Sequence, residues 1–233
     1  YHSQVFNYMN PQYYYGDLSR SVENPSRRQH QTMANAHLGI ASTNKDTPIQ
    51  FMGEVGMNLF KQKYPTNIAE GSENNFYLKG DIWKPFNDQR FGLAWDFNTY
   101  SYSMDDMKGT TSLELNPYYG YENDDWRIRL GAHVDWWSGI DDEVNFSPDV
   151  NVEYIFSDSY VLYAKAGGGR ENKSLMELTE FTPYWTLSHP YILPTYMSLD
   201  AAIGLKASPI NGLWFNLTGG YQIRKDDLFW KLV

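Results

Sequence analysis

Apolar residues occupy every second position in long stretches of this chain. In residues 125–137 the apolar register holds six residues: Trp126, Ile128, Leu130, Ala132, Val134 and Trp136. The register between them is polar and holds Arg127, Arg129, His133 and Asp135. A period of two places alternate side chains on opposite faces of a β-strand, whereas a helix repeats every 3.6 residues. The pattern therefore predicts strands with one apolar face and one polar face.

Twelve segments show this alternation, some in a shortened form. They are residues 4–15, 31–42, 49–60, 75–84, 90–102, 110–121, 125–137, 144–156, 160–168, 196–207, 212–224 and 228–232. The connections between them alternate between short turns and longer loops, of which residues 169–195 form the longest. Short turns at one rim and long loops at the other are typical of outer-membrane β-barrels.

The fold that this pattern predicts is all-β: an antiparallel, up-and-down transmembrane β-barrel of about 12 strands. The apolar faces would meet lipid and the polar faces would line a wet lumen. No linker-like tract interrupts the chain, so residues 1–233 are expected to form a single barrel domain. The segment 228–232 is shorter than the ~9–11 residues that cross a bilayer. The domain is therefore expected to be part of a larger barrel, incomplete at one or both ends.

Composition narrows the class of protein further. Aromatic residues make up 17% of the chain, with 19 Tyr and 8 Trp, and such amphipathic rings suit a membrane boundary. The mean hydropathy of −0.58 is compatible with a barrel, because half of each strand faces a polar lumen. The formal net charge of −9 argues against nucleic acid as a partner. There is no cysteine and no histidine motif with ligand spacing, so neither a metal nor another cofactor is expected.

Several motifs resemble a known family. They are TSLELNPYYGYENDDWRIRLGAHVDWW at residues 111–137, NFSPDVNVEYIFSDSYVLYAKAGGG at 145–169, SLMELTEFTPYW at 174–185 and SLDAAIGLKASPINGLWFNLTGGY at 198–221. The chain is similar there to bacterial outer-membrane β-barrel proteins without a plug, commonly labelled TonB-dependent-receptor-like. The resemblance implies a location in the bacterial outer membrane, in a longer parent with further strands. It names no ligand, and it does not extend to the plug or the energy-coupling box of the TonB-dependent receptors.

The inward charges are the candidate site residues. Ten side chains are expected to line the lumen: Glu54, Lys79, Asp96, Glu114, Arg127, Arg129, His133, Asp149, Glu153 and Lys165. Short turns fix the register and predict that Glu114 lies opposite His133, Asn151 opposite Lys165, and His37 opposite Glu54. Lys79 is expected beside Asp96. With Asp149 and Glu153 diagonal to Lys165, these neighbours are interpreted as ion pairs that stiffen the wall, with a selectivity filter or a catalytic pair as alternatives.

Two further expectations concern chemistry. An enzyme is not expected, because no motif supplies a nucleophile or a bound metal beside the histidine and carboxylate pairs. The long loop carries Phe181, Tyr184, Trp185 and Tyr191, which could bind a ligand by stacking on sugars or could plug the lumen. Packing of these rings into the barrel mouth is the alternative.

The function expected from these observations is passage or uptake of a small polar solute through an outer-membrane barrel. A structural or accessory subunit of an outer-membrane complex is a second hypothesis, and a soluble carbohydrate-binding β-sandwich is a third. The expected partners are outer-membrane lipid and lipopolysaccharide, the solute itself, and other outer-membrane proteins.

Overall fold

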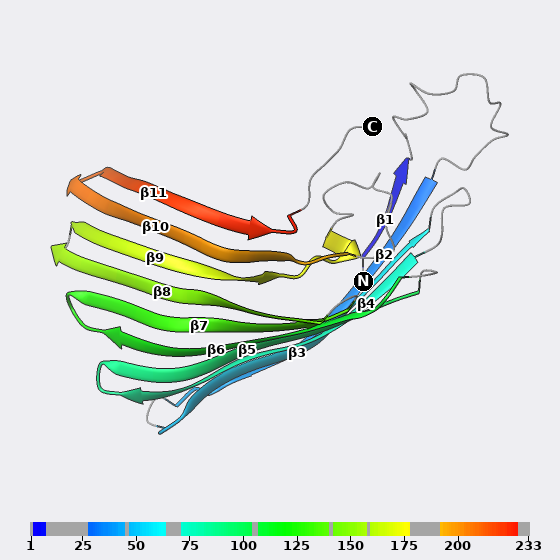
Figure 1. Ribbon diagram of the computed structural model, residues 1–233, viewed down its shortest axis with the longest axis horizontal. Coiled ribbons are helices and arrows are strands. Elements are labelled where there is room, and N and C mark those ends of the chain that lie inside the picture. Colours follow the sequence, from blue (N-terminus) through cyan, green and yellow to red (C-terminus); the bar gives the residue numbers. More distant parts are fainter. Residues whose placement is uncertain are drawn as a thin grey trace, which may run out of the picture.

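The computed structural model describes residues 2–7, 28–44, 47–63, 71–103, 107–139, 142–157, 159–177 and 192–227, and side chains from Gln31 onward. Eleven strands form one antiparallel sheet in sequence order (Figure 1). They are β1 (His2–Asn7), β2 (Arg28–Ala41), β3 (Gln50–Lys63), β4 (Gly71–Phe86), β5 (Gln89–Tyr102), β6 (Thr110–Glu122), β7 (Trp126–Ser138), β8 (Glu143–Ser157), β9 (Tyr160–Glu171), β10 (Thr195–Ile210) and β11 (Leu213–Lys225).

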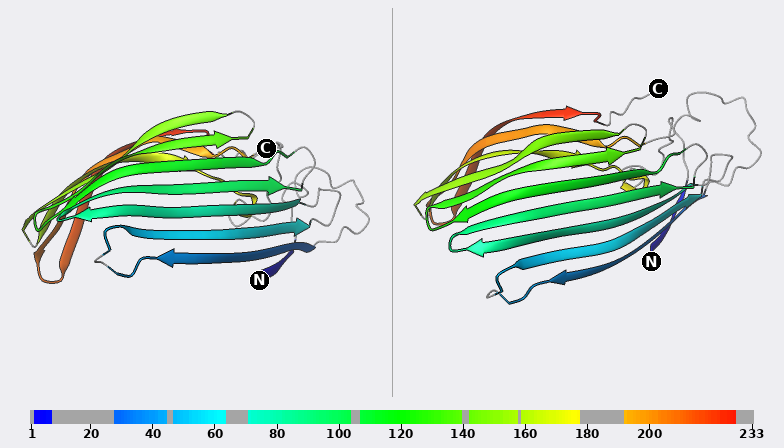
Figure 2. Two further views of the ribbon diagram at one scale, coloured as in Figure 1. Left: turned by 90° about the horizontal axis from the view of Figure 1, so that it is seen from below. Right: turned by 60° about the horizontal axis from the view of Figure 1, so that its bottom comes forward.

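The sheet is a curved, open wall. Strands β2 to β11 have 12–16 residues each, more than the ~9–11 that cross a bilayer. The hairpin turns gather at one rim and the longer connections at the other, as the sequence predicts (Figures 1 and 2). Strands β1 and β11 are the two edges of the sheet. Because an open edge cannot lie unpaired in lipid, the fold is part of a larger transmembrane barrel.

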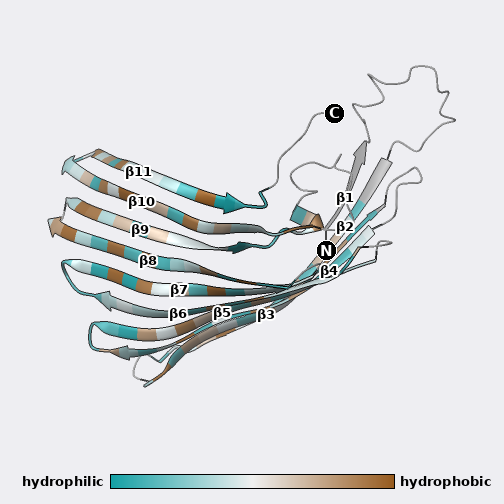
Figure 3. Ribbon diagram, in the orientation of Figure 1, coloured by the Kyte–Doolittle hydropathy of each residue, from teal (hydrophilic) through white to brown (hydrophobic). Residues whose placement is uncertain are grey.

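The two faces of the sheet reverse the usual arrangement of polar and apolar side chains. On the outer, convex face Leu38 is 68% exposed and Phe146 70% exposed, whereas Asn116 is 3% exposed on the inner, concave face. Apolar and polar residues alternate along the strands in Figure 3. In a water-soluble protein large apolar side chains are mostly inside. The outer face is therefore the lipid-facing surface of the wall.

Aromatic rings form a band on the outer face near the short turns. The ring centroids lie 5.1 Å apart for Phe91 and Tyr119, and 4.6 Å apart for Trp126 and Tyr154. The ring of Phe156 stacks on that of Tyr160 at 5.4 Å. Rings with an apolar body and a polar tip favour the membrane boundary, so this band marks the level of one interface.

None of the described residues forms a helix long and apolar enough to cross a membrane.

The expected strands at the two ends of the chain lie partly or wholly outside the described residues. Only residues 2–7 of the first strand region are described, and the expected strand at 228–232 lies outside the described residues. Pro148 lies within β8. Its pairing with Ala132 in β7 is regular, but the pairing of β8 with β9 begins only at Val150. Proline has no N–H to donate, and the ladder on the β9 side stops short of it.

The predicted register between β6 and β7 is wrong by two residues. Glu114 lies directly opposite Asp135, and His133 is its diagonal neighbour on the same face. Glu122 pairs with Arg127, so four residues separate the last paired residues rather than two, and Asn123 Oδ1 accepts hydrogen bonds from the N–H groups of Asp125 (3.1 Å) and Trp126 (2.7 Å). This local bonding keeps Asp125 in the turn.

Of the other register predictions, one is wrong and two are confirmed. His37 lies opposite Gly56 rather than Glu54, because the connection from β2 to β3 is longer than expected. The Gln50 side chain holds that connection by donating to the carbonyl oxygen of Asn44 at 2.9 Å. The direct pairing of Asn151 with Lys165 and the pairing of Lys79 with Asp96 are confirmed.

Tyrosine rings lie over glycines on the inner face. A Cβ atom added at Gly92 would lie 2.3 Å from Cζ of Tyr118, and one at Gly204 would lie 2.4 Å from Cζ of Tyr163. The same contact joins Gly56 and Tyr77 at 2.4 Å. Each tyrosine ring therefore covers the backbone of the neighbouring strand at a glycine. Any other residue in place of that glycine would displace the ring.

Candidate functional site

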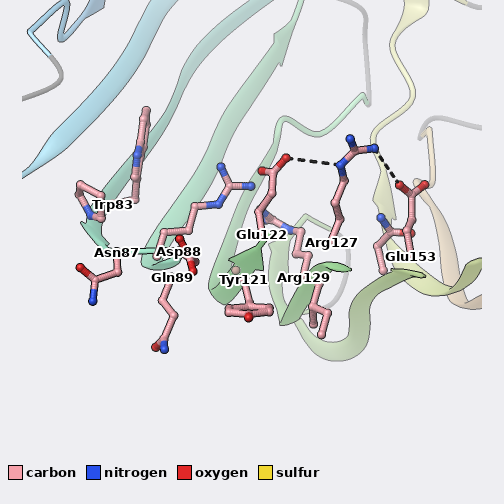
Figure 4. Close-up of a pocket in the computed structure, with 14 residues that line it drawn as sticks. Trp83, Asn87, Asp88, Gln89, Tyr121, Glu122, Arg127, Arg129 and Glu153 are labelled. Atoms are coloured by element: carbon pink, nitrogen blue, oxygen red, sulfur yellow. Dashed lines mark ion pairs between the residues drawn. The ribbon is translucent and has the colours of Figure 1, made fainter. Parts of the chain in front are cut away.

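A polar cavity of about 610 Å³ lies on the inner face at the short-turn rim, between β4 and β8. Its lining includes Trp83, Asn87, Arg90, Arg127, Arg129 and Glu153. Figure 4 shows Trp83, Asn87, Arg127, Arg129 and Glu153 along the turn ends of successive strands, with the ion pairs drawn as dashed lines. The cavity combines three guanidinium groups, carboxylates, amides and an indole ring.

Gly120 provides the space in which two of the arginines lie. It pairs with Arg90 of β5 on one side and with Arg129 of β7 on the other. A Cβ atom at Gly120 would lie 2.7 Å from Nε of Arg90. The Arg90 side chain therefore lies across β6, and a larger residue at position 120 would push it away.

Arg129 is held by two hydrogen bonds and one ring contact. Its Nε donates to Oδ2 of Asp149 at 2.6 Å, and its Nη2 donates to Oδ1 of Asn116 at 3.1 Å. Its Cζ lies 3.8 Å from the ring centroid of Tyr118. The Tyr118 hydroxyl in turn donates to Asp81 at 2.9 Å. Arg129 is therefore fixed as part of the wall.

Arg127 is paired more loosely. Its guanidinium lies 3.4 Å from a carboxylate oxygen of Glu122 and 3.6 Å from one of Glu153. Both distances exceed the ~2.7–2.9 Å of a charge-assisted hydrogen bond. The close bond of Glu153 goes instead to Nζ of Lys206, at 2.9 Å. Charges of alternating sign thus run from β6 to β10 along the rim.

Arg90 is the cation of the cavity that has no acidic partner. No carboxylate of the described residues lies within 4.0 Å of it. Its Cζ lies 5.9 Å from the Tyr118 ring centroid, and the residue is exposed to the cavity. Arg90 is one of the residues that line the cavity.

A row of carboxylates crosses the wall further from the turns. Asp96, Glu114 and Asp135 are direct neighbours on β5, β6 and β7. Lys79 lies 3.2 Å from Asp96, and His133 Nδ1 lies 2.6 Å from Glu114. Asp135 is 1% exposed, and its carboxylate has no hydrogen-bond partner among the described residues. A space of about 20 Å³ beside this row is large enough for one water molecule.

His133 has a serine as its neighbour on β8. Ser147 lies directly opposite His133, but its buried hydroxyl has no hydrogen-bond partner in the part of the chain that the structure describes. A nucleophile and its base normally lie within hydrogen-bond reach. The expectation that the chain is not an enzyme stays a prediction.

All ten side chains predicted to line the lumen lie on the inner face. Of those not yet described, Glu54 accepts a hydrogen bond from the Tyr77 hydroxyl at 2.9 Å, and Lys165 donates to Asp200 at 3.0 Å. Their part in solute passage stays a prediction. The aromatic residues predicted to bind a ligand lie outside the described residues: Phe181, Tyr184, Trp185 and Tyr191.

The chain after β9 crosses the inner face at the long-loop rim. We call residues 172–177 the inward segment. Leu175 is 1% exposed and packs with Phe60 and Ile192, and its N–H donates to Glu73 Oε2 at 2.5 Å. The Asn172 side chain donates to the Ser112 hydroxyl at 2.9 Å. The inward segment therefore joins β9 to strands β3, β4 and β6 across the concave side.

No family model and no curated protein matches the chain. The family suggested by the sequence motifs therefore stays a prediction.

Several solved outer-membrane proteins are similar at low identity. The translocator domain of autotransporter NalP from Neisseria meningitidis is 16% identical with a TM-score of 0.38, over 84% of this chain and 75% of that chain. The pyoverdine outer membrane receptor FpvA from Pseudomonas aeruginosa PAO1 is 15% identical with a TM-score of 0.48, over 82% and 35%. The ferric yersiniabactin uptake receptor FyuA from Yersinia pestis is 11% identical with a TM-score of 0.44, over 86% and 37%.

The chain thus spans about a third of the length of the two receptors. TM-scores below 0.5 at these identities assign neither a family nor a function, and the fold assignment rests on the sheet itself.

Proposed function

We propose that this chain forms part of the wall of a bacterial outer-membrane barrel through which a small polar solute passes or in which it is captured. The observation that carries the proposal is the polar cavity on the inner face of a wall whose outer face is apolar. A solute in this cavity would meet charged and amide side chains while the outer face keeps lipid away. No catalytic step and no cofactor are part of the proposal.

The outer face and the loop arrangement support the location. Short turns face the periplasm in outer-membrane barrels, so the cavity would open on the periplasmic side. The inward segment would lie at the opposite, extracellular mouth. The expected neighbours are membrane lipid, lipopolysaccharide and other outer-membrane proteins.

The alternatives differ in what they require of the sheet. A soluble sandwich needs a second sheet over the apolar face, and the eleven described strands all belong to one sheet. A structural subunit needs no open lumen. That second hypothesis gains support if the barrel conducts no ions.

Conductance of the full-length protein in planar bilayers tests the proposal. We expect an ion current, and a larger one in Leu175→Asp, because an aspartate cannot stay in the apolar contact with Phe60 and Ile192 that holds the inward segment. Glu177→Gln is the control, since Glu177 is exposed within the same segment. Absence of current in wild type and Leu175→Asp alike would contradict passage and favour the structural role.

A further inference from the structure

We propose that the cavity at the short-turn rim binds an oxyanion group, a carboxylate or a phosphate, carried by the solute, and that the Arg90 guanidinium is its anchor. The inference rests on the proposed function in one respect, since it names the chemical class of the solute. The site itself is defined by the geometry of β5, β6 and β7.

The three arginines of the cavity differ in how many donors they have free. Arg129 is committed to Asp149 and Asn116, and Arg127 has only loose ion pairs to Glu122 and Glu153. Arg90 has neither a carboxylate partner nor a hydrogen bond from its guanidinium to the described residues. The free donors are therefore those of Arg90 first and of Arg127 second.

A guanidinium with free donors recognises planar oxyanions best. Its parallel N–H groups match the two oxygens of a carboxylate or a phosphate and form two charge-assisted hydrogen bonds. An oxyanion would neutralise the positive charge of Arg90, whereas a neutral solute would not.

The surroundings of Arg90 restrict the position of its side chain. Gly120 leaves the space that the side chain crosses, and the centroid of the Tyr118 ring lies 5.9 Å from the Arg90 Cζ. Tyr118 is itself fixed by Asp81 and by the stacked Arg129. An anchor held this way loses little conformational freedom when it binds.

Glu122 is the competing group in the cavity. Its carboxylate lies 3.4 Å from Arg127, and both residues are exposed. Exposed ion pairs of this kind contribute little to stability. An incoming oxyanion can therefore take the place of Glu122 beside Arg127 while its main contact is with Arg90.

The test is titration calorimetry of the full-length protein in detergent with inorganic phosphate and with acetate. We expect binding of at least one, weakened about tenfold by Arg90→Gln and less by Arg90→Lys, which keeps the charge but loses the paired donors. Lys84→Gln is the matched control. It removes one positive charge from the outer face of β4, close to the same rim, and is expected to leave the affinity unchanged.

Each outcome of the titration supports or overturns the proposed anion site. Tighter binding of phosphate points to phosphorylated solutes, and tighter binding of acetate points to carboxylated ones. Absence of binding of both anions, or an equal loss in Arg90→Gln and Lys84→Gln, would overturn the site. Planar-bilayer currents separate the two proposals: current without anion binding removes the site and keeps passage, and anion binding without current does the reverse.

Discussion

Leu130→Arg is expected to prevent efficient assembly of the protein into outer membranes. Leu130 lies near the middle of β7 on the outer face and is 45% exposed. A cation at the midplane of a lipid-facing barrel surface costs roughly 2–4 kcal/mol. The measurement is the folded fraction in bilayers or detergent, read from the mobility difference between heated and unheated protein on gels.

Gln222→Arg is the control for that substitution. The residues Leu130, Val150, Ala166, Ala201 and Tyr221 form one row of paired residues from β7 to β11, and Gln222 is the next residue along β11. It lies on the inner face, opposite Asp200, where a new cation gains a partner. If both variants fold equally well, the outer face does not meet lipid.

Gly92→Val is expected to destabilise the wall by about 2–3 kcal/mol, the cost of overfilling a packed site. A Cβ atom at position 92 would lie 2.3 Å from the Tyr118 ring, so the ring must move. Moving it breaks the hydrogen bond to Asp81 and the stacking of Arg129. Urea unfolding from detergent, followed by tryptophan fluorescence, measures the change.

Two variants separate this contact from a general effect of valine. Gly219→Val should have little effect, because no atom lies within 4 Å of a Cβ built there. Gly92→Val combined with Tyr118→Ala should cost less than the sum of the two single changes, since the clash is gone. Additive losses would show that the ring and the glycine act independently.

The faces of the sheet could be predicted from the sequence because a period of two determines them whatever the register. Leu130 and Arg129 are on the faces that the alternation assigns to them. The partner of each residue depends instead on turn length. A single turn residue, Asn123, accepts hydrogen bonds from the N–H groups of Asp125 and Trp126, and the partner of Glu114 is Asp135 instead of His133.

The candidate site was less accessible from the sequence for the same reason. Arg90 stands in the polar register at the start of its strand, but nothing in the sequence shows that it has no acidic partner. That fact depends on which side chains face Gly120 across two ladders. The contact of the inward segment with Glu73 joins residues 102 positions apart, beyond any local pattern.

The central claim is that the two faces of the wall meet lipid and water respectively, and a cysteine scan of β7 tests it most directly. The chain has no cysteine of its own, so each residue from 127 to 136 can carry one fluorescent label. Quenching by brominated lipid should be strong at Ile128, Leu130 and Val134 and weak at Arg127 and Arg129, with the opposite order for a water-soluble quencher. Equal quenching along the strand, or water access at the apolar positions, would contradict the barrel wall.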